Sequence, residues 1–205
     1  MKVGDLYDQY QIMPQLATHM LGVAGVGKII TNSWEDRAVA NKCVKACLLH
    51  DLGNIVKFDL SSPVMPIENI MYWQEVQRVV RQKYGADAHE ATYAMLAELK
   101  LDEYIGYLKE EAIMYVRDPK PDDFVGASRP SLIVLYSDLR VVPKGIVSMK
   151  ARIADLIKRY GDDRAESRWG KDLEIYIQTL TKVDVTTISD RDVAPLFSDL
   201  LAIEI

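Results

Sequence analysis

The chain has 205 residues, of which 49% are hydrophobic and 27% charged, and its formal net charge at neutral pH is −5. This length and composition are typical of one folded domain with a sizeable core, so we expect a single domain over residues 1–205. The acidic charge argues against a protein that binds nucleic acid or anionic membranes nonspecifically, so any site for a polyanion must be local.

The beginning of the chain, MKVGDLYDQYQIMP, contains no apolar segment of the signal-peptide type. The longest weakly polar run, Leu21 to Ile30, is too short to cross a bilayer. We therefore expect a cytoplasmic protein. Its only cysteines, Cys43 and Cys47, lie four residues apart and point to one face of a predicted helix, so a disulfide framework is implausible. We expect buried free thiols, although both could join His50 as soft metal ligands on one helical stripe.

Apolar residues that recur at intervals of three and four predict helices along most of the chain. The first predicted helix covers residues 14–32, with Pro14 at its start, and the second runs from near Asp36 to His50. Further helices are predicted at residues 68–83, 88–100, 101–115, 131–139, 148–160, 164–180 and, as a short terminal helix, 189–205. The run 131–139 could be mistaken for a strand, but it has no partner strand. We expect loops at residues 57–66, which could fold over a site near His50, and at 118–130 and 141–147. The sequence therefore predicts an all-α protein.

A His-Asp pair stands at the end of the second predicted helix, in the stretch ACLLHDLGN. Adjacent side chains on a regular helix diverge by about 100°, so His50 and Asp51 can share one ion only at a bent or frayed end. We expect Gly53 to supply that bend. The alternative is that Asp51 caps a following helix and His50 is a hydrogen-bonded core residue.

The three histidines of the chain, His19, His50 and His89, all lie at the inner face or the start of a predicted helix. Asp138 closes an apolar helix, where an unpaired carboxylate would cost several kcal/mol unless a cation meets it. Imidazole and carboxylate donors suit Mn, Fe, Zn, Ni or Co better than Ca. A divalent metal site would account for these placements.

The order of His, His-Asp and a distant Asp on a helical chain resembles the HD-domain superfamily of metal-dependent phosphohydrolases. The matching residues are His19 in LATHMLGVAGVG, His50 and Asp51 in ACLLHDLGN, and Asp138 in LYSDLRV. The resemblance implies an HD-domain helical bundle, with a metal-binding core at about residues 15–140 and additional C-terminal helices at about 148–205. It also implies that these four residues bind one divalent ion (Mn, Fe, Co, Ni, Zn or Mg), a second ion being possible.

His89 lies between the His-Asp pair and Asp138, where family members with two metals often place an additional histidine. The sequence leaves three alternatives open: His89 is a further metal ligand, contacts a substrate phosphate, or simply begins its helix.

The resemblance implies hydrolysis of a phosphomonoester or phosphodiester, often a nucleotide, by metal-activated water. Asp51 would bridge two ions or orient that water. The expected partner is therefore a small phosphorylated substrate, with no membrane and no large nucleic acid. The alternative is a catalytically weak or inactive metal-stabilised domain that binds or senses a nucleotide.

The chain departs from the family pattern at one residue expected to handle protons. Some family members carry Glu or Lys close behind the His-Asp pair, whereas this chain has Asn54, which can hydrogen-bond a phosphate but is neither an acid nor a base. Lys57 and Arg140 could each contact a substrate phosphate, with Arg140 giving the better bidentate clamp. Each could equally be an ordinary exposed charge.

The segment Gly22 to Lys28 matches G-x-x-x-x-G-K, the start of a phosphate-binding P-loop. However, Ile29 follows where the magnesium-binding Ser or Thr belongs, and nothing strand-like precedes Gly22. We expect the small residues instead to let this helix approach its neighbours closely around His19.

The last long predicted helix carries an apolar stripe. The stripe either completes the core of the same subunit or forms a homodimer surface, and it consists of Trp169, Leu173, Tyr176, Ile177 and Leu180.

Overall fold

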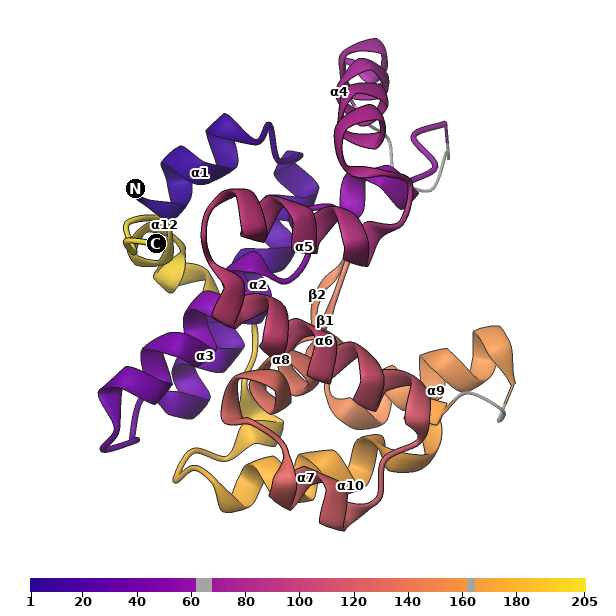
Figure 1. Ribbon diagram of the computed structural model, residues 1–205. Helices are drawn as coiled ribbons and strands as arrows, with labels where there is room; N and C mark the ends of the chain where they lie inside the picture. Colours follow the sequence, from indigo (N-terminus) through magenta and orange to yellow (C-terminus); the bar gives the residue numbers. More distant parts are fainter. Residues whose placement is uncertain (62–67, 162–164) are drawn as a thin grey trace.

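The computed structural model describes residues 1–61, 68–161 and 165–205, with only the backbone of 165–168. Helices dominate the described chain, so the all-α prediction is confirmed (Figure 1). The α-helices and short 3₁₀ helices (η) are, in order, α1 (Val3–Gln9), α2 (Pro14–Thr31), α3 (Arg37–Leu49), η1 (Asn54–Lys57), α4 (Ile70–Tyr84), α5 (Ala88–Glu98), α6 (Asp102–Arg117), α7 (Pro121–Gly126), α8 (Arg129–Arg140), α9 (Met149–Tyr160), α10 (Ala165–Thr179), η2 (Val185–Thr187), α11 (Asp190–Val193), η3 (Ala194–Leu196) and α12 (Phe197–Leu201).

Several helices begin at residues that satisfy the free N–H groups of a first turn. The Asp36 side chain accepts a hydrogen bond from the backbone N–H of Val39 at the start of α3. The Ser148 hydroxyl does the same for Ala151 at the start of α9. Pro14 is the first residue of α2, a position where its missing N–H costs nothing. The predicted starts of these helices are therefore confirmed.

The structure differs from the predicted elements in several places. Helices α1 and α7 form where none was predicted, and residues 141–147 contain a small hairpin rather than a loop. Its strands β1 (Val141–Val142) and β2 (Gly145–Ile146) pair antiparallel. The predicted terminal helix is divided into α11, η3 and α12 around Pro195, which has no N–H to continue a helix. Residues 62–66 of the predicted loop over the site lie outside the described residues, as does residue 164, the first residue of a predicted helix.

The core is built around α2, which packs against both α3 and α8, while α3 packs against α8. Small residues let α2 come close to its neighbours. A Cβ atom at Gly25 would lie 2.3 Å from Val193 Cγ1, and one at Gly27 would lie 3.0 Å from Ile133 Cγ2 and 3.1 Å from Cys47 Sγ. The glycine run is thus the interior of a packed helix, which confirms the predicted close approach and rules out a P-loop.

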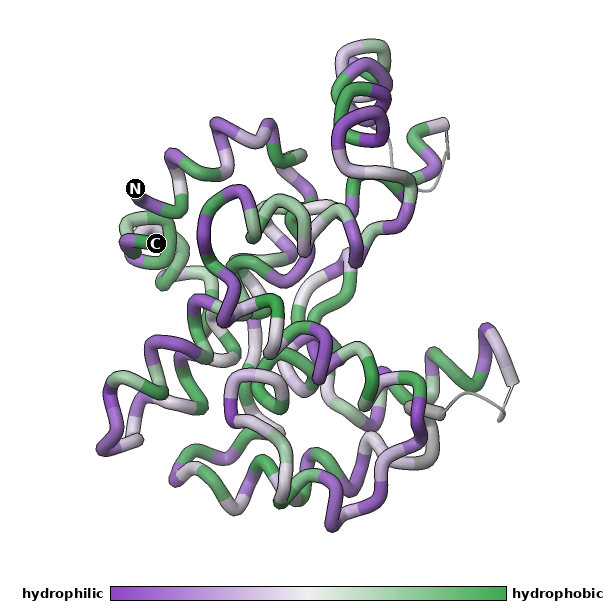
Figure 2. The backbone as a smooth tube through the Cα atoms, viewed as in Figure 1, coloured by the Kyte–Doolittle hydropathy of each residue, from purple (hydrophilic) through white to green (hydrophobic). Residues whose placement is uncertain are grey.

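The two ends of the chain lie side by side (Figure 1). The N–H of Val3 donates to the carbonyl of Ile203, and the N–H of Ile205 donates to that of Met1, both at 2.9 Å. The C-terminal stripe contributes to the same core, because Trp169, Leu173 and Ile177 are buried in it. Hydrophobic and hydrophilic residues alternate along the helices in Figure 2, as expected for amphipathic helices. In the described residues, no helix is both long and apolar enough to cross a membrane.

Candidate metal centre

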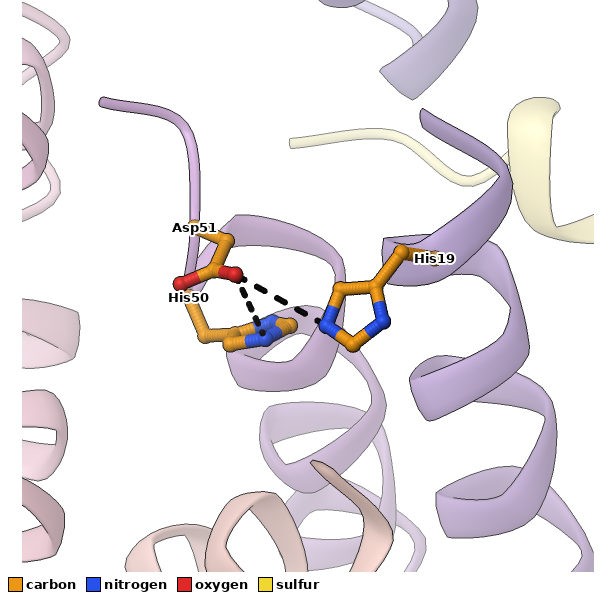
Figure 3. A group of neighbouring side chains, drawn as sticks. All are labelled: His19, His50 and Asp51. Atoms are coloured by element: carbon orange, nitrogen blue, oxygen red, sulfur yellow. Dashed lines mark ion pairs between the residues drawn. The ribbon is translucent and has the colours of Figure 1, made fainter. Parts of the chain in front are cut away.

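Two histidines and an aspartate converge from helices that are distant in sequence. His19 projects from the second turn of α2, and His50 and Asp51 follow the last residue of α3. Their side chains point toward one another in Figure 3. The Oδ2 atom of Asp51 lies 3.7 Å from His19 Nε2 and 3.5 Å from His50 Nε2. One ligand atom from each residue lies within 4.8 Å of the others, so this group could hold a metal ion.

Asp138, on the last turn of α8, joins this group through both imidazoles. Its Oδ1 atom lies 2.9 Å from His19 Nε2 and 3.6 Å from His50 Nε2. The structure therefore brings together the four residues on which the family resemblance was based.

The environment of His50 fits a metal ligand. Its Nδ1 lies 2.8 Å from the carbonyl oxygen of Cys47. A carbonyl can only accept, so Nδ1 must carry the proton, and the lone pair of a neutral ring is then on Nε2. Nε2 is buried and has no hydrogen-bond partner in the structure. A buried acceptor of this kind is costly unless something binds it, and a divalent cation would do so.

In the absence of a metal, the charges of this cluster perturb one another. Burial would lower the pKa of His50, but Asp51 and Asp138 outweigh that effect and raise it to about 9. Burial would raise the pKa of Asp138, but its close contact with His19 and the positive charges of His19 and His50 hold that pKa well below its ordinary value. Both shifts show that the site favours opposite charges placed close together.

The site is reachable from solvent on the side of its carboxylates and His19. The His50 side chain is only 7% exposed, whereas those of His19 and Asp138 are 24% and 33% exposed. A small molecule could therefore reach the cluster without unfolding the core.

The chain turns at residues 50–53, between α3 and η1, as the sequence predicted. However, Gly53 has φ −86° and ψ −2°, a conformation open to any residue, so the turn itself does not require a glycine. The glycine is required for a different reason. A Cβ atom there would lie 2.6 Å from the backbone nitrogen of Thr92 and 2.8 Å from the carbonyl oxygen of Ala88. The N–H of Gly53 also donates to the Thr92 hydroxyl at 2.9 Å. Close packing of α5 thus fixes the segment that carries His50 and Asp51.

The model of one protein family, the HD domain, matches residues 16–121, about half of the chain. The chain belongs to the HD-domain family. Comparison with curated proteins and with solved structures finds no significant match. The matched region of the HD domain includes His19, His50 and Asp51 but ends before Asp138. The placement of Asp138 beside the two histidines is therefore an independent structural observation.

The remaining predicted ligands of this HD domain lie outside the cluster. His89 is exposed on the first turn of α5, where its ring stacks on Tyr93 with centroids 6.3 Å apart. The structure does not bring it into the group that could hold a metal. Cys43 and Cys47 are buried free thiols, as expected. Burial raises the pKa of the Cys47 thiol well above its ordinary value, and neither sulfur belongs to the metal-binding group.

Arg140 is not a substrate clamp, which corrects the prediction made from its position near Asp138. The residue is 1% exposed. Its guanidinium donates to the Tyr136 hydroxyl and to the carbonyls of Val185 and Ile188, at 2.6, 2.6 and 2.9 Å. Its Nε donates to the carbonyl of Val147. Because these hydrogen bonds lie within the protein, Arg140 has a structural role.

Asn54 and Lys57 are the first and last residues of η1. Asn54 is 3% exposed and its side-chain oxygen is buried without a hydrogen-bond partner in the structure. Lys57 is exposed at the end of η1. It lies close enough to Glu111 on α6 for its charge to lower the pKa of that carboxyl.

Glu111 is a residue of this neighbourhood that the sequence analysis missed. Its charge interacts with those of Asp138, His50 and Asp51. The available signal was helical spacing, because Glu111 continues the stripe of Tyr104 and Leu108, which are buried. An acidic residue on the inner stripe of a helix is unusual enough to identify it as a candidate.

Proposed function

We propose that this HD domain hydrolyses a phosphomonoester or phosphodiester of a small molecule, of the nucleotide class, with a divalent metal ion held by His19, His50, Asp51 and Asp138. The observation that carries the proposal is the buried, unpartnered Nε2 of His50 beside His19 and two carboxylates. Membership of the HD-domain family supports the same chemistry.

Among the proposed ligands, His50 is buried and fixed in orientation, whereas His19 and Asp138 are partly exposed. The hydrogen bond from His50 Nδ1 to Cys47 fixes the ring, so its second nitrogen faces the carboxylates. His19 and Asp138 are partly exposed, which leaves a side of the site open to a phosphate ester. When bound, the metal would neutralise phosphate charge and favour ionisation of water near neutral pH. Lys57, exposed and near Glu111, would attract the dianionic substrate.

The nucleotide class is favoured over a nucleic acid polymer by charge. The whole protein carries a net charge of −5, so a polyanion would be repelled outside the local cationic site. A mononucleotide presents one phosphate group and requires no extended basic surface.

A second candidate function is a nucleotide-binding sensor that does not turn its ligand over. It is favoured by Asn54, which occupies the third position after Asp51 and cannot accept or donate a proton in acid-base catalysis. An HD domain with asparagine at this position could bind a metal ion and a nucleotide without hydrolysing the nucleotide.

The test combines metal analysis with turnover. Purified protein is analysed for bound metals, then assayed with a chromogenic phosphate ester and a panel of nucleotides in the presence of Mn²⁺, Co²⁺, Ni²⁺ or Mg²⁺. We expect metal-dependent hydrolysis that falls at least about 100-fold in Asp51→Asn, since losing a ligand should cost no less than losing an outer-shell partner. Asp172→Asn, an exposed aspartate on α10, is the matched control and should retain full activity. Tight nucleotide binding with no turnover would identify the sensor. The absence of both binding and turnover would contradict both functions.

A further inference from the structure

Helix α3 ends at Leu49, directly before the His-Asp pair. The last four carbonyl groups of an α-helix have no partner inside the helix, and those of Cys47 and Leu48 are among them in α3. The Cys47 carbonyl lies 2.8 Å from His50 Nδ1 and orients that ring. The Leu48 carbonyl accepts a hydrogen bond from the Tyr7 hydroxyl at 2.7 Å, and this contact is buried. A side chain from another helix therefore holds the turn that precedes the metal ligands.

Tyr7 comes from a part of the chain that lies far from the His-Asp pair in sequence. It precedes Leu48 by 41 positions and belongs to α1. The region that matches the HD domain begins only at residue 16, so the matched region does not supply this hydroxyl. Tyr7 is therefore a feature of this chain that the family pattern could not identify.

Packing holds α1 in place, because a helix of 7 residues is not stable alone. Val3, Leu6 and Tyr7 share its buried face. The helix lies beside α12 (Figure 1), and the N–H of Val3 donates to the carbonyl of Ile203 at 2.9 Å. Beyond the other end of α1, the N–H of Ile12 donates to the Tyr7 carbonyl at 2.9 Å. The buried Tyr7 ring is thus carried by a fixed backbone, and its hydroxyl has a defined position.

The Leu48 carbonyl is close enough along the chain to affect both members of the His-Asp pair. Only Leu49 separates Leu48 from His50, and the neighbouring carbonyl of Cys47 holds the imidazole. A buried carbonyl that loses its donor is unfavourable, so the last turn of α3 would shift to find another partner. Metal–ligand distances tolerate a displacement of only about 0.2 Å, so a small shift of this turn would weaken metal binding.

We propose that Tyr7 is a positioning residue of the metal centre, which acts through the last turn of α3 on His50 and Asp51. The inference rests on the proposed function, because that function depends on the same metal site. In this role Tyr7 contacts the backbone of α3 and is not a metal ligand. Its hydroxyl fixes the Leu48 carbonyl, the neighbouring Cys47 carbonyl fixes His50 Nδ1, and the Nε2 atom of that ring faces the carboxylates.

The test compares Tyr7→Phe with Tyr84→Phe, since each substitution removes only a hydroxyl. Tyr84 on α4 donates to Glu98 at 2.9 Å, so the control also loses a hydrogen bond, but one that does not involve α3. Mn²⁺ binding to the chelator-treated protein is measured by titration calorimetry, and circular dichroism verifies folding. We expect the Kd for Mn²⁺ to rise about tenfold in Tyr7→Phe, the lower end of the range for outer-shell partners, because Tyr7 acts through the backbone. Tyr84→Phe should bind Mn²⁺ as the wild type does.

A purely structural role for Tyr7 predicts a different result. Tyr7→Phe would then lower the urea midpoint of the metal-free protein and leave the Mn²⁺ affinity of the folded protein unchanged. The absorption bands of bound Co²⁺ report the geometry of the ligands and provide a second readout. We expect these bands to change in Tyr7→Phe and to stay the same in Tyr84→Phe. At saturating Mn²⁺, kcat of Tyr7→Phe should return to within about threefold of the wild type, because Tyr7 takes no part in the chemical step.

The possible failures of this test have different meanings. A Kd for Mn²⁺ in folded Tyr7→Phe within about twofold of the wild-type value would overturn the inference, whatever the stability of the variant. If metal-free Tyr7→Phe is partly unfolded, both proteins are compared in the osmolyte TMAO, which favours the folded state. Wild-type protein that binds neither Mn²⁺ nor Co²⁺ would instead contradict the metal site, and with it the proposed function. The failure of the inference alone is therefore distinguishable from that of the proposed function.

Discussion

Gly53 is a residue at which the segment that carries His50 and Asp51 lies very close to α5. The atoms nearest to a Cβ at this position are the backbone nitrogen of Thr92 at 2.6 Å, Ala91 Cβ at 2.7 Å and the carbonyl oxygen of Ala88 at 2.8 Å. Backbone atoms cannot move aside as a flexible side chain can. We therefore expect Gly53→Ala to lower the free energy of unfolding by about 1–3 kcal/mol through overpacking, as measured by urea denaturation.

Gly106 provides the matched control for this substitution. It lies within α6, and a Cβ atom there would meet nothing within 4 Å. Gly106→Ala should raise the free energy of unfolding by about 0.5–1 kcal/mol, because alanine loses less backbone entropy in a helix. Equal effects of the two substitutions would show that α5 does not constrain the His-Asp segment. The sequence predicted that Gly53 is needed for its backbone conformation, whereas the structure shows that it is needed for close packing against α5. Because α5 begins more than thirty residues later, no local pattern reveals this contact.

At the scale of elements, α8 is connected to the C-terminal segment by Arg140. Its guanidinium reaches the carbonyls of Val185 and Ile188 and lies 3.9 Å from Glu174 on α10. Arg140→Met would keep much of the buried volume but leave these carbonyls without donors. We expect a loss of about 2–5 kcal/mol in the free energy of unfolding by urea denaturation. Arg159→Met, which removes only an exposed pair with Asp155, should cost less than about 1 kcal/mol.

The same comparison separates a structural role for Arg140 from a catalytic one. If Arg140 bound substrate, its replacement by Met would raise KM while leaving the midpoint of unfolding nearly unchanged. We expect the opposite result, a lower midpoint with KM unchanged in the protein that remains folded.

The elements that the sequence predicted correctly have local signals. The start of α3 has the Asp36 cap, that of α9 the Ser148 cap, and α2 has proline at its first position. Helices α1 and α7 are short, with 7 and 6 residues, so periodicity could not identify them. The β1–β2 hairpin is held partly by Asp190, whose carboxylate accepts from the N–H of Ile146 at 3.1 Å. A contact between residues so far apart has no local signature.

The candidate site was likewise predictable only in part. The family pattern identified His19, the His-Asp pair and Asp138, all of which the structure brings together. Glu111 could not be found that way, because its position depends on how α6 aligns with α3. Arg140 was misassigned because sequence proximity to Asp138 does not reveal which side of α8 faces the metal centre.

At the scale of the whole molecule, the candidate metal centre joins α2, the end of α3 and α8, helices that pack against one another in the core. The pKa of His50 is raised from 6.5 to about 9 in the folded protein, so the folded state binds this proton more tightly than the unfolded state does. The resulting stability is fully present below pH 6.5 and is lost as pH rises through about 9. The lowered pKa of Asp138 has the opposite sign, so its contribution is lost on acidification. Metal-free protein should therefore lose on the order of 1–3 kcal/mol of stability between about pH 6.5 and 9.

Metal binding should reverse this dependence on pH. A cation competes with the proton for His50 Nε2, so its affinity rises as the ring loses that proton. A ligand that binds only the folded state stabilises it by about 2.7 kcal/mol at a concentration 100 times its Kd. Thermal unfolding of chelator-treated protein, with and without Mn²⁺ at pH 6 and pH 8.5, should show a larger shift at the higher pH. In Asp138→Asn the shift should be small at both values, and the metal-free protein should depend less on pH. Two results would contradict this prediction. One is a thermal midpoint of the metal-free protein that increases as the pH is raised above 6.5, and the other is an Mn²⁺ shift in Asp138→Asn equal to that of the wild type. Either would show that these residues do not form one site coupled to the folding of the core.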